Sequence, residues 1–362
     1  MTELNVGAAA GESTPVDWDA AVRRAAMLAP PGPSGTPADL RALVEVLRRS
    51  AAEAPAHIAE ITGLHEAAAQ AEEVPVFVVD RPRWSEANAT MFASLIGDLM
   101  PVPSMPAGAR LAGEEMGVIL AILSTKVLGQ YDPFAQRLLL VAPNVRKVER
   151  ELELDVMDFR LWVCLHEQTH AVQFAAAPWL ADHLRERMRS LISTMAQAGS
   201  STLEQAFRSA VDQVTSLVRS AEATDDADNP VRGAGGGPLI ESFLTEDQRD
   251  DLAGIVAVMS LLEGHADVVM DAVDPARLPS VRHIRKAFDR RRDTPTGLDH
   301  ILRRVLGMDA KLAQYRDGAA FVRAVVDQVG HDGLAAVWSG PEQLPTAGEI
   351  ADPASWVQRV HG

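Results

Sequence analysis

The pentapeptide HEQTH at residues 166–170 carries the residue types and the spacing of a metal site. Two histidines four residues apart lie on one face of an α-helix, so both imidazoles can converge on one Zn²⁺ at about 2.0–2.1 Å. Glu167 lies about 100° further round the helix, where it would not bind the ion but could act as a general base toward a water at the metal. The spacing predicts that His166 and His170 are zinc ligands and that Glu167 is catalytic.

A catalytic zinc site needs a third protein ligand and keeps a fourth position open. The metzincin continuation would place Gly at position 173 and His at position 176, whereas this chain has Gln173 and Ala176, which excludes that class. The expected third ligand is Glu263, in the segment SLLEGHADVVMD at 260–271, because this apolar helix otherwise has no reason to carry Glu, His and Asp so close together. The alternative for Glu263 is an exposed acid on an amphipathic helix.

Two more polar residues share that segment. Asp267 lies one turn after Glu263, and we expect it to accept the free ring N–H of His166 or His170. His265 is offset by about 200° from Glu263 around the helix, so it is not expected to bind the same ion. It either lines the cleft or is an ordinary polar residue.

Amide hydrolysis also needs a hydrogen-bond donor for the tetrahedral oxyanion. The chain has only two tyrosines, Tyr131 and Tyr315, and either of them could donate, as could His265. The alternative for each tyrosine is a hydroxyl that anchors a turn or a helix.

The composition excludes several classes of protein. The chain has 362 residues, with 34 Lys+Arg against 50 Asp+Glu, and a formal net charge of −16. This acidic excess argues against nucleic acid and anionic membranes as partners, because both require a surplus of Lys and Arg. The basic stretch at 282–292 is expected to pair with acidic helices rather than to bind phosphate. The single cysteine, Cys164, excludes an internal disulfide and a cysteine-rich zinc module.

Hydrophobic periodicity predicts helix over most of the chain. Helices are expected at about 37–49, 85–100, 114–128, 158–177, 245–271 and 280–291. The first of these has Thr36 as its N-cap, and Thr245 with Gln248 forms a capping box before another. Strands are expected at 74–80 and 137–141, with a turn at 131–133. The pattern predicts a mainly α fold of the α+β class with a small β-sheet.

The expected organisation is one domain over residues 15–362 after a disordered tail at 1–14, with a flexible acidic and Gly-rich loop at 224–238. The tail lacks the basic and apolar regions of a signal peptide, and no run of about 18 apolar residues suggests a membrane span. We therefore expect a cytoplasmic protein.

Five stretches together resemble a known family. They are DRPRWSEANATMF (80–92), MGVILAILSTKVLGQYDPF (116–134), LHEQTHAVQF (165–174), LLEGHADVVMD (261–271) and GMDAKLAQYRDG (307–318). They resemble a zincin-like family of zinc metallopeptidases or hydrolases common in high-GC bacteria. The first stretch is similar to the branch labelled as associated with biosynthesis of the deazaflavin coenzyme. The resemblance implies a zincin-like helical fold and one Zn²⁺ on His166, His170 and Glu263, but it implies no substrate.

Three functions stay open at this point. The first is a gluzincin-like zinc hydrolase that cleaves a peptide or amide bond. The second is a zincin-like binding or assembly module that keeps zinc for structure. The third is an amide hydrolase acting on a small metabolite in deazaflavin coenzyme metabolism. The intact Glu167 favours catalysis, because this residue binds no metal and would be dispensable in a scaffold. The expected partner is a peptide or small amide substrate.

Overall fold

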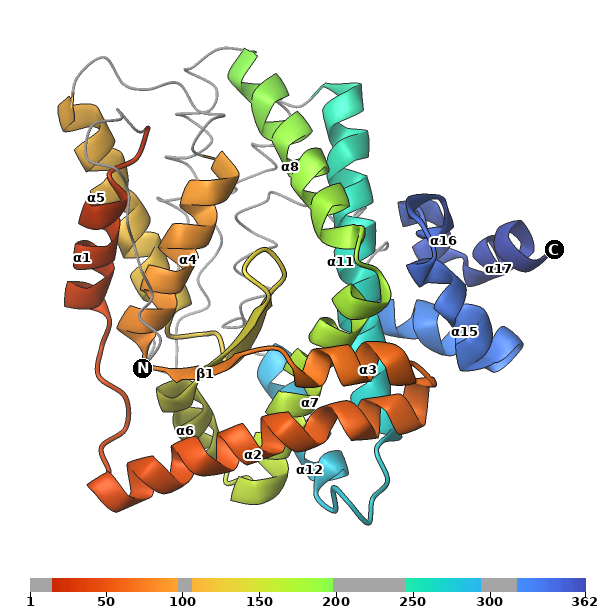
Figure 1. The fold of residues 1–362 in the computed structure, drawn as a ribbon, viewed down its shortest axis with the longest axis horizontal. Coiled ribbons are helices and arrows are strands. Elements are labelled where there is room, and N and C mark those ends of the chain that lie inside the picture. The colour runs from red at the N-terminus through yellow and green to blue at the C-terminus, as the bar shows by residue number, and fades with distance from the viewer. Residues whose placement is uncertain (1–14, 97–105, 198–244, 294–317) are drawn as a thin grey trace, which may run out of the picture. The chain divides into compact units, whose positions relative to one another are not determined.

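The computed structural model describes residues 15–96, 106–197, 245–293 and 318–362. These residues form a mainly helical fold with one small sheet, which confirms the predicted fold class (Figure 1). They fall into two compact units, which are described separately. The single domain over 15–362 stays a prediction, and the tail at 1–14 and the loop at 224–238 lie outside the described residues.

The first unit contains three described helices, α1 (Trp18–Leu28), α4 (Arg81–Ile96) and α5 (Pro106–Leu123). Helix α1 begins after Asp17, whose Oδ1 accepts the N–H of Ala20 at 2.8 Å. Helix α1 packs against both α4 and α5, and its buried residues are alanines, which allow close helix approach. Helix α5 begins earlier than the expected 114–128, because Pro106 suits the first helical position, and it ends at Leu123.

The second unit contains the remaining described elements. Before the sheet lie α2 (Pro37–Thr62) and α3 (His65–Glu72), and the strands are β1 (Val76–Val79), β2 (Gly129–Asp132) and β3 (Arg137–Val141). After them come α6 (Ala142–Glu151), α7 (Val156–Ala176), α8 (Leu180–Gln197), α11 (Glu246–Ala272), α12 (Val281–Asp293), α15 (Gly318–Leu334), α16 (Ala347–Ala351) and α17 (Pro353–His361), with short 3₁₀ helices at Ala335–Trp338 and Pro341–Gln343. Helix α8 runs on past Leu191, where the first unit resumes.

The sheet has the strand order β1-β3-β2. Strand β1 is parallel to β3, and β2 is antiparallel to β3 with Gly129 opposite Leu140. Every residue of β3 is buried, as expected for a central strand, whereas β2 lies at the edge of the sheet. The predicted strands at 74–80 and 137–141 are therefore confirmed.

The predicted turn at 131–133 is wrong in its position. Tyr131 and Asp132 belong to β2, and the chain reverses just after them. Asp132 Oδ1 accepts the backbone N–H groups of Phe134 and Ala135, both at 3.1 Å, and Asp132 Oδ2 accepts from Arg137 Nε at 3.1 Å. The local Asp-Pro signal is correct for the turn, but pairing with β3 extends the strand up to it.

Helix α7 lies at the centre of the second unit, with α2 and α3 packed against it. Asp155 caps its start by accepting from the N–H groups of Met157 and Asp158. The capping box of α2 forms between Thr36 and Asp39, but the helix continues to Thr62 instead of ending near position 49. Its buried second half packs in the same core cluster as α7, and this tertiary burial keeps the helix going past the predicted end.

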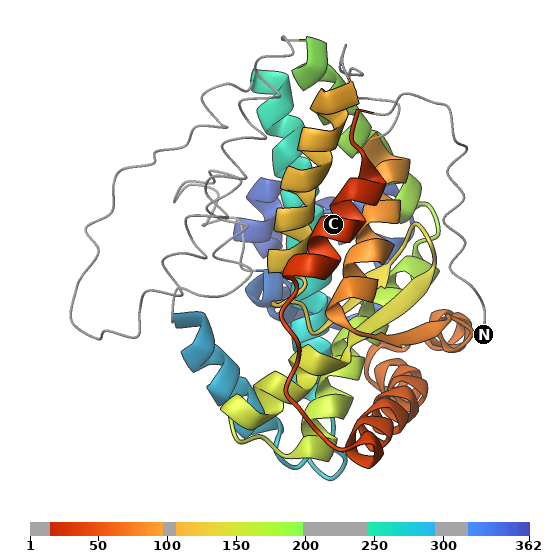
Figure 2. The same ribbon diagram turned by 90° about the vertical axis from the view of Figure 1, so that its left-hand side faces the viewer.

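Helix α11 starts at the predicted capping box of Thr245 and Gln248. Its segment Gln248–Ala272 is the one described helix long and apolar enough to cross a membrane, but 67% of its most apolar window is buried, as in the core helix of a folded protein. Helices α8 and α11 run side by side, and α15 crosses α11 on another face (Figures 1 and 2). Helices α7 and α11 each pack against several other helices, and this packing positions the side chains at their contact.

Candidate metal centre

Three side chains from α7 and α11 meet at one point in the second unit. His166 Nε2 lies 3.2 Å from His170 Nε2 and 3.5 Å from one carboxylate oxygen of Glu263, and His170 Nε2 lies 3.5 Å from the other oxygen. The exposed fraction of the side chain is 23% for His166, 13% for His170 and 56% for Glu263. The two imidazoles are therefore recessed and the carboxylate forms the open side.

These distances fit a metal ion. Four ligands held tetrahedrally at 2.0–2.1 Å from a Zn²⁺ are separated from one another by about 3.3 Å. The two Nε2 atoms lie 3.2 Å apart, each lies 3.5 Å from a different carboxylate oxygen of Glu263, and one ligand atom from each residue can be chosen so that all three lie within 4.8 Å of one another. Two imidazoles and one carboxylate are ligand types that bind Zn²⁺ in catalytic sites. The geometry agrees with the ligand set expected from the sequence.

Gln173 bonds to the ring of His170 at Nδ1, the nitrogen that does not face the other two candidate ligands. His170 Nδ1 lies 2.9 Å from Gln173 Oε1, and Gln173 Nε2 donates to the carbonyl oxygen of Leu262 at 2.9 Å. Gln173 Nε2 also lies 3.0 Å from Nδ1 of His265. Gln173 is fully buried, so its amide is enclosed by these partners.

The charges of the three candidate ligands are coupled. Burial disfavours the charged imidazole, but the hydrogen bond and the charge of Glu263 outweigh this effect and raise the pKa of His166 to about 9. For His170 burial dominates and lowers the pKa. Partial loss of solvation raises the pKa of Glu263, whose side chain stays 56% exposed, but the hydrogen bond with His166 and the two imidazoles lower the pKa to about 2. At neutral pH the metal-free site therefore has one imidazolium and one carboxylate.

Glu167 lies on α7 beside the edge strand β2. Its side chain is buried, and burial together with Glu263 raises its pKa to about 7, although His166 and a hydrogen bond from the backbone N–H of Tyr131 oppose the rise. A Cβ at position 129 would lie 2.6 Å from Cγ of Glu167, so only glycine lets β2 pass this close. A buried carboxyl with a pKa near neutrality suits a general base.

Comparison with known proteins agrees with this geometry. The model of the zincin-like metallopeptidase family matches residues 16–357. The chain belongs to the zincin-like metallopeptidase family. A crystal structure from Chloroflexus aurantiacus, described as that of "a putative hydrolase with a novel fold", is 32% identical, with a TM-score of 0.64 over 95% of this chain and 98% of that one. A comparison with curated proteins finds no match.

Membership of the zincin-like metallopeptidase family indicates a metal-dependent hydrolase, and the family implies a metal ion, usually zinc. The general prediction from the sequence, a zincin-like hydrolase with a His-His-Glu group, is therefore confirmed. The deazaflavin-associated branch is a finer expectation that these comparisons do not test.

The expectation that His265 lines the cleft and donates to the oxyanion requires a correction. Its side chain is only 1% exposed, and it lies on the side of α11 away from the open face of the site, with its ring 5.5 Å from that of Trp338. Burial lowers the pKa of His265 to about 3, so the imidazole is neutral. His265 therefore does not line the cleft and is not placed to donate to an oxyanion. It lies behind His170, joined to it through Gln173.

Of the two tyrosines, the structure describes one. The ring of Tyr131 packs 5.6 Å from that of Phe174, and burial beside Asp132 raises the pKa of Tyr131 to about 12. The phenol is therefore protonated and able to donate. Tyr315, the other expected donor, lies outside the described residues.

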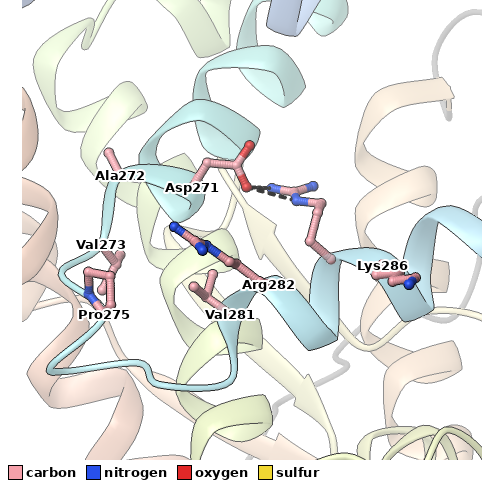
Figure 3. Close-up of a pocket in the computed structure, with 8 residues that line it drawn as sticks. Asp271, Ala272, Val273, Pro275, Val281, Arg282 and Lys286 are labelled. Atoms are coloured by element: carbon pink, nitrogen blue, oxygen red, sulfur yellow. Dashed lines mark hydrogen bonds and ion pairs between the residues drawn. The ribbon is translucent and has the colours of Figure 1, made fainter.

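Asp267 pairs with Arg285 of α12. Its Oδ1 accepts from Arg285 Nη1 at 2.9 Å. Arg285 Nε also donates to Asp271 Oδ1 at 2.8 Å, and Figure 3 draws this second contact at Asp271. The Nδ1 atom of His170 is bonded to Gln173, so Asp267 is not the partner of this ring, and the other expected partner of Asp267, the ring N–H of His166, stays a prediction. The basic segment that begins at Arg282 does pair with an acidic helix through Arg285, beside a hollow of about 470 Å³ at the end of α11.

The residue that sequence reasoning missed is Gln173. In the sequence, Gln173 stands out only because it occupies the position where the metzincin pattern has glycine. Its position three residues after His170 places it on the same helix face, which was the one available signal. Its importance depends on α11, and no pattern within 166–176 indicates where the Leu262 carbonyl lies.

Proposed function

We propose that this chain is a zinc-dependent hydrolase of the gluzincin kind that cleaves a peptide or amide bond. In this proposal His166, His170 and Glu263 hold one Zn²⁺ and Glu167 is the general base. The observation that supports it most strongly is the set of three donor-atom separations, 3.2, 3.5 and 3.5 Å, next to a buried carboxyl. Bound at this site, Zn²⁺ would act as a Lewis acid that polarises a carbonyl and makes water nucleophilic near neutral pH.

Glu167 supplies the proton transfer in this proposal. As a carboxylate it takes a proton from the attacking water and then gives that proton to the leaving nitrogen. Its raised pKa, about 7, suits both steps because the group gains and loses a proton readily at neutral pH. The protonated phenol of Tyr131 is the described candidate for the oxyanion donor, with Tyr315 as the second candidate from the sequence.

The sheet edge favours a peptide as the substrate. Strand β2 lies at the edge of the sheet, and its backbone passes directly beside Glu167. An extended peptide could add to such an edge as a further strand, which would bring its amide groups past the catalytic carboxyl. A small amide metabolite has no comparable use for a strand edge. We also propose a cytoplasmic location and no nucleic-acid or membrane partner, in line with the acidic composition.

The test compares the wild type with Glu167→Gln. Metal content is measured by mass spectrometry after purification, and turnover is measured on a broad peptide library. We expect about one Zn²⁺ per chain in both proteins and a loss of roughly 10²–10⁴-fold in turnover in the variant. Glu60→Gln, an exposed acid on α2, is the matched control and should change neither quantity.

Two outcomes would contradict the proposal, and a third would change its substrate. A wild type without stoichiometric metal removes the zinc site. Zinc without turnover on peptides, in both wild type and variant, indicates a binding or assembly module. Turnover on small amides and not on peptides would keep the zinc hydrolase but replace the peptide with a small metabolite as its substrate.

A further inference from the structure

A single buried amide joins the two helices of the metal centre. Gln173 of α7 is fully buried and has three polar partners, namely Nδ1 of His170, the carbonyl oxygen of Leu262 and Nδ1 of His265. The last two partners belong to α11. Each contact is 2.9 or 3.0 Å long, which is the usual length of a good hydrogen bond.

The partners fix the orientation of the Gln173 amide. The carbonyl oxygen of Leu262 can only accept a hydrogen bond, so the atom that faces it must be the amide nitrogen. The amide oxygen then faces His170, and because that oxygen can only accept, Nδ1 of His170 must carry the proton. The lone pair of the neutral His170 ring is consequently at Nε2. This is the atom that lies 3.2 Å from His166 and 3.5 Å from Glu263.

The same amide also locates the third candidate ligand. Leu262 directly precedes Glu263 in α11, so the hydrogen bond to its carbonyl holds the backbone next to that carboxylate. The second amide hydrogen points to His265, whose Nδ1 must accept it, and His265 is itself fixed between Gln173 and the ring of Trp338. One side chain therefore controls the tautomer of His170 and the position of α11 beside Glu263.

We infer that Gln173 is the positioning residue of this metal centre, which sets the tautomer of His170 and holds α11 so that Glu263 meets the two imidazoles. The inference rests on the proposed metal site and adds to it. Outer partners that orient a ligand histidine typically change metal affinity 10- to 100-fold when they are removed. A buried amide that served packing alone would change the stability of the fold but not the tautomer of His170.

The chain supplies a matched control for this distinction. Gln168 is a second buried glutamine on α7, and its Nε2 donates to the carbonyl oxygen of Ala51 at 3.0 Å. It thus joins α7 to another helix, as Gln173 does, but it touches none of the candidate ligands. Replacing either glutamine with methionine keeps the length of the side chain and removes its hydrogen bonds.

The first experiment needs no variant of Gln173 and no metal. Long-range ¹H–¹⁵N NMR of the metal-free wild type, with the His170 signals assigned by their loss in His170→Asn, reports which ring nitrogen carries the proton. We expect a protonated Nδ1 and an unprotonated Nε2 at pH 8. A His170 ring protonated at Nε2 only, or a mixture of tautomers, would overturn the inference whether or not the protein binds zinc.

The second experiment measures Zn²⁺ affinity by competition with a chromophoric chelator, together with the visible spectrum of the Co²⁺-substituted protein. Gln173→Met should weaken Zn²⁺ binding 10- to 100-fold and alter the Co²⁺ spectrum, whereas Gln168→Met should change affinity less than threefold. Gln173→Glu keeps an oxygen opposite His170 Nδ1 but loses the N–H that donates to the Leu262 carbonyl, so it should restore part of the affinity that Gln173→Met loses. It also serves as the informative variant if the methionine protein does not fold.

The outcomes separate this inference from the proposed function. If the wild type binds no Zn²⁺, the proposed function fails, while the NMR result still decides the tautomer. If the wild type binds Zn²⁺ and the methionine variants at 173 and 168 bind it equally well, the metal site stands and Gln173 is not its positioning residue. Failure of Gln173→Glu to bind better than Gln173→Met would also overturn the inference.

Discussion

Gly129 of the edge strand lies directly against the side chain of Glu167. A Cβ at position 129 would be 2.6 Å from Cγ, 2.8 Å from Cδ and 2.9 Å from Oε1 of that side chain. Two residues further along β2, the backbone N–H of Tyr131 donates to the same carboxylate. The backbone of β2 therefore determines where the side chain of Glu167, the proposed general base, lies.

Replacing Gly129 with alanine should separate catalysis from metal binding. The added methyl group must push Glu167 aside, and a displacement of about 1 Å typically costs on the order of 10² in rate. We expect kcat to fall by roughly that factor while Zn²⁺ affinity changes less than about threefold, because neither histidine is touched. Steady-state kinetics and metal titration check this.

Gly348→Ala is the control for that substitution. A Cβ at position 348 would meet only Oγ1 of Thr346, at 3.9 Å, so this alanine should leave kcat unchanged. A Gly129→Ala protein with full activity would show that Glu167 is free to move or does not act as the base.

Metal affinity should depend on pH through a single proton. In the metal-free protein the pKa of His166 is about 9, that of His170 is lowered and that of Glu263 is about 2. Zn²⁺ requires neutral imidazoles, so between about pH 7 and 9 binding must displace one proton, from His166. We expect the apparent association constant to rise about tenfold per pH unit over this range, or about 1.4 kcal/mol per unit, and to level off above 9.

The same proton affects the stability of the metal-free fold. Because the pKa of His166 is raised from 6.5 to about 9, its proton stabilises the folded state fully below pH 6.5, and this contribution is lost as the pH rises through 9.

Calorimetric titrations of the metal-free protein with Zn²⁺, in buffers of different ionisation enthalpy, count the protons that metal binding releases. A count near two at pH 8 would show that His170 is charged as well and would contradict the charge state described above.

The contact between α11 and α15 should control the position of Glu263. A Cβ at Gly264 would clash with the carbonyl carbon of Gly318, so the two helices meet backbone to backbone next to the candidate ligand. Gly264→Ala should destabilise the fold by about 1–3 kcal/mol and weaken Zn²⁺ binding as α11 shifts. Chemical denaturation of the metal-free protein and metal titration measure the two effects.

Gly318→Ala tests that interpretation from the other helix. Its Cβ would clash with the carbonyl oxygen of Ser260, so it should separate the same pair of helices. Because both substitutions open one contact, their costs should not add in the double variant. Additive costs, or full Zn²⁺ affinity in both single variants, would show that this contact does not place Glu263.

Local signals located much of the fold. Thr36, predicted as an N-cap, and Thr245, predicted in a capping box, both start helices, and strand 137–141 has its predicted bounds because every residue in it is buried. The end of α2 was missed because burial against α7 extends the helix across Pro55, a residue that would otherwise favour a break. Strand β2 was missed because four residues become a strand only through pairing with β3.

Some residues of the candidate site could likewise be predicted from the sequence and others could not. The pairing of His166 with His170 follows from helix geometry within one segment, so their spacing was sufficient. Glu263 was found by its incongruity on an apolar helix, which is a weaker signal but needs no knowledge of the contact. Gln173 and Gly129 were not found, because each acts through a backbone group of another element, and only the packed structure brings these groups together.

The central claim is that one ion is held by side chains from α7 and α11. Its most direct test is a crystal structure of the purified protein with anomalous data collected on both sides of the zinc absorption edge. The account predicts one anomalous peak at about 2.0–2.2 Å from Nε2 of His166, Nε2 of His170 and a carboxylate oxygen of Glu263. A fully loaded protein whose zinc peak lies elsewhere, or a peak bound by the two histidines with Glu263 turned away, would contradict it.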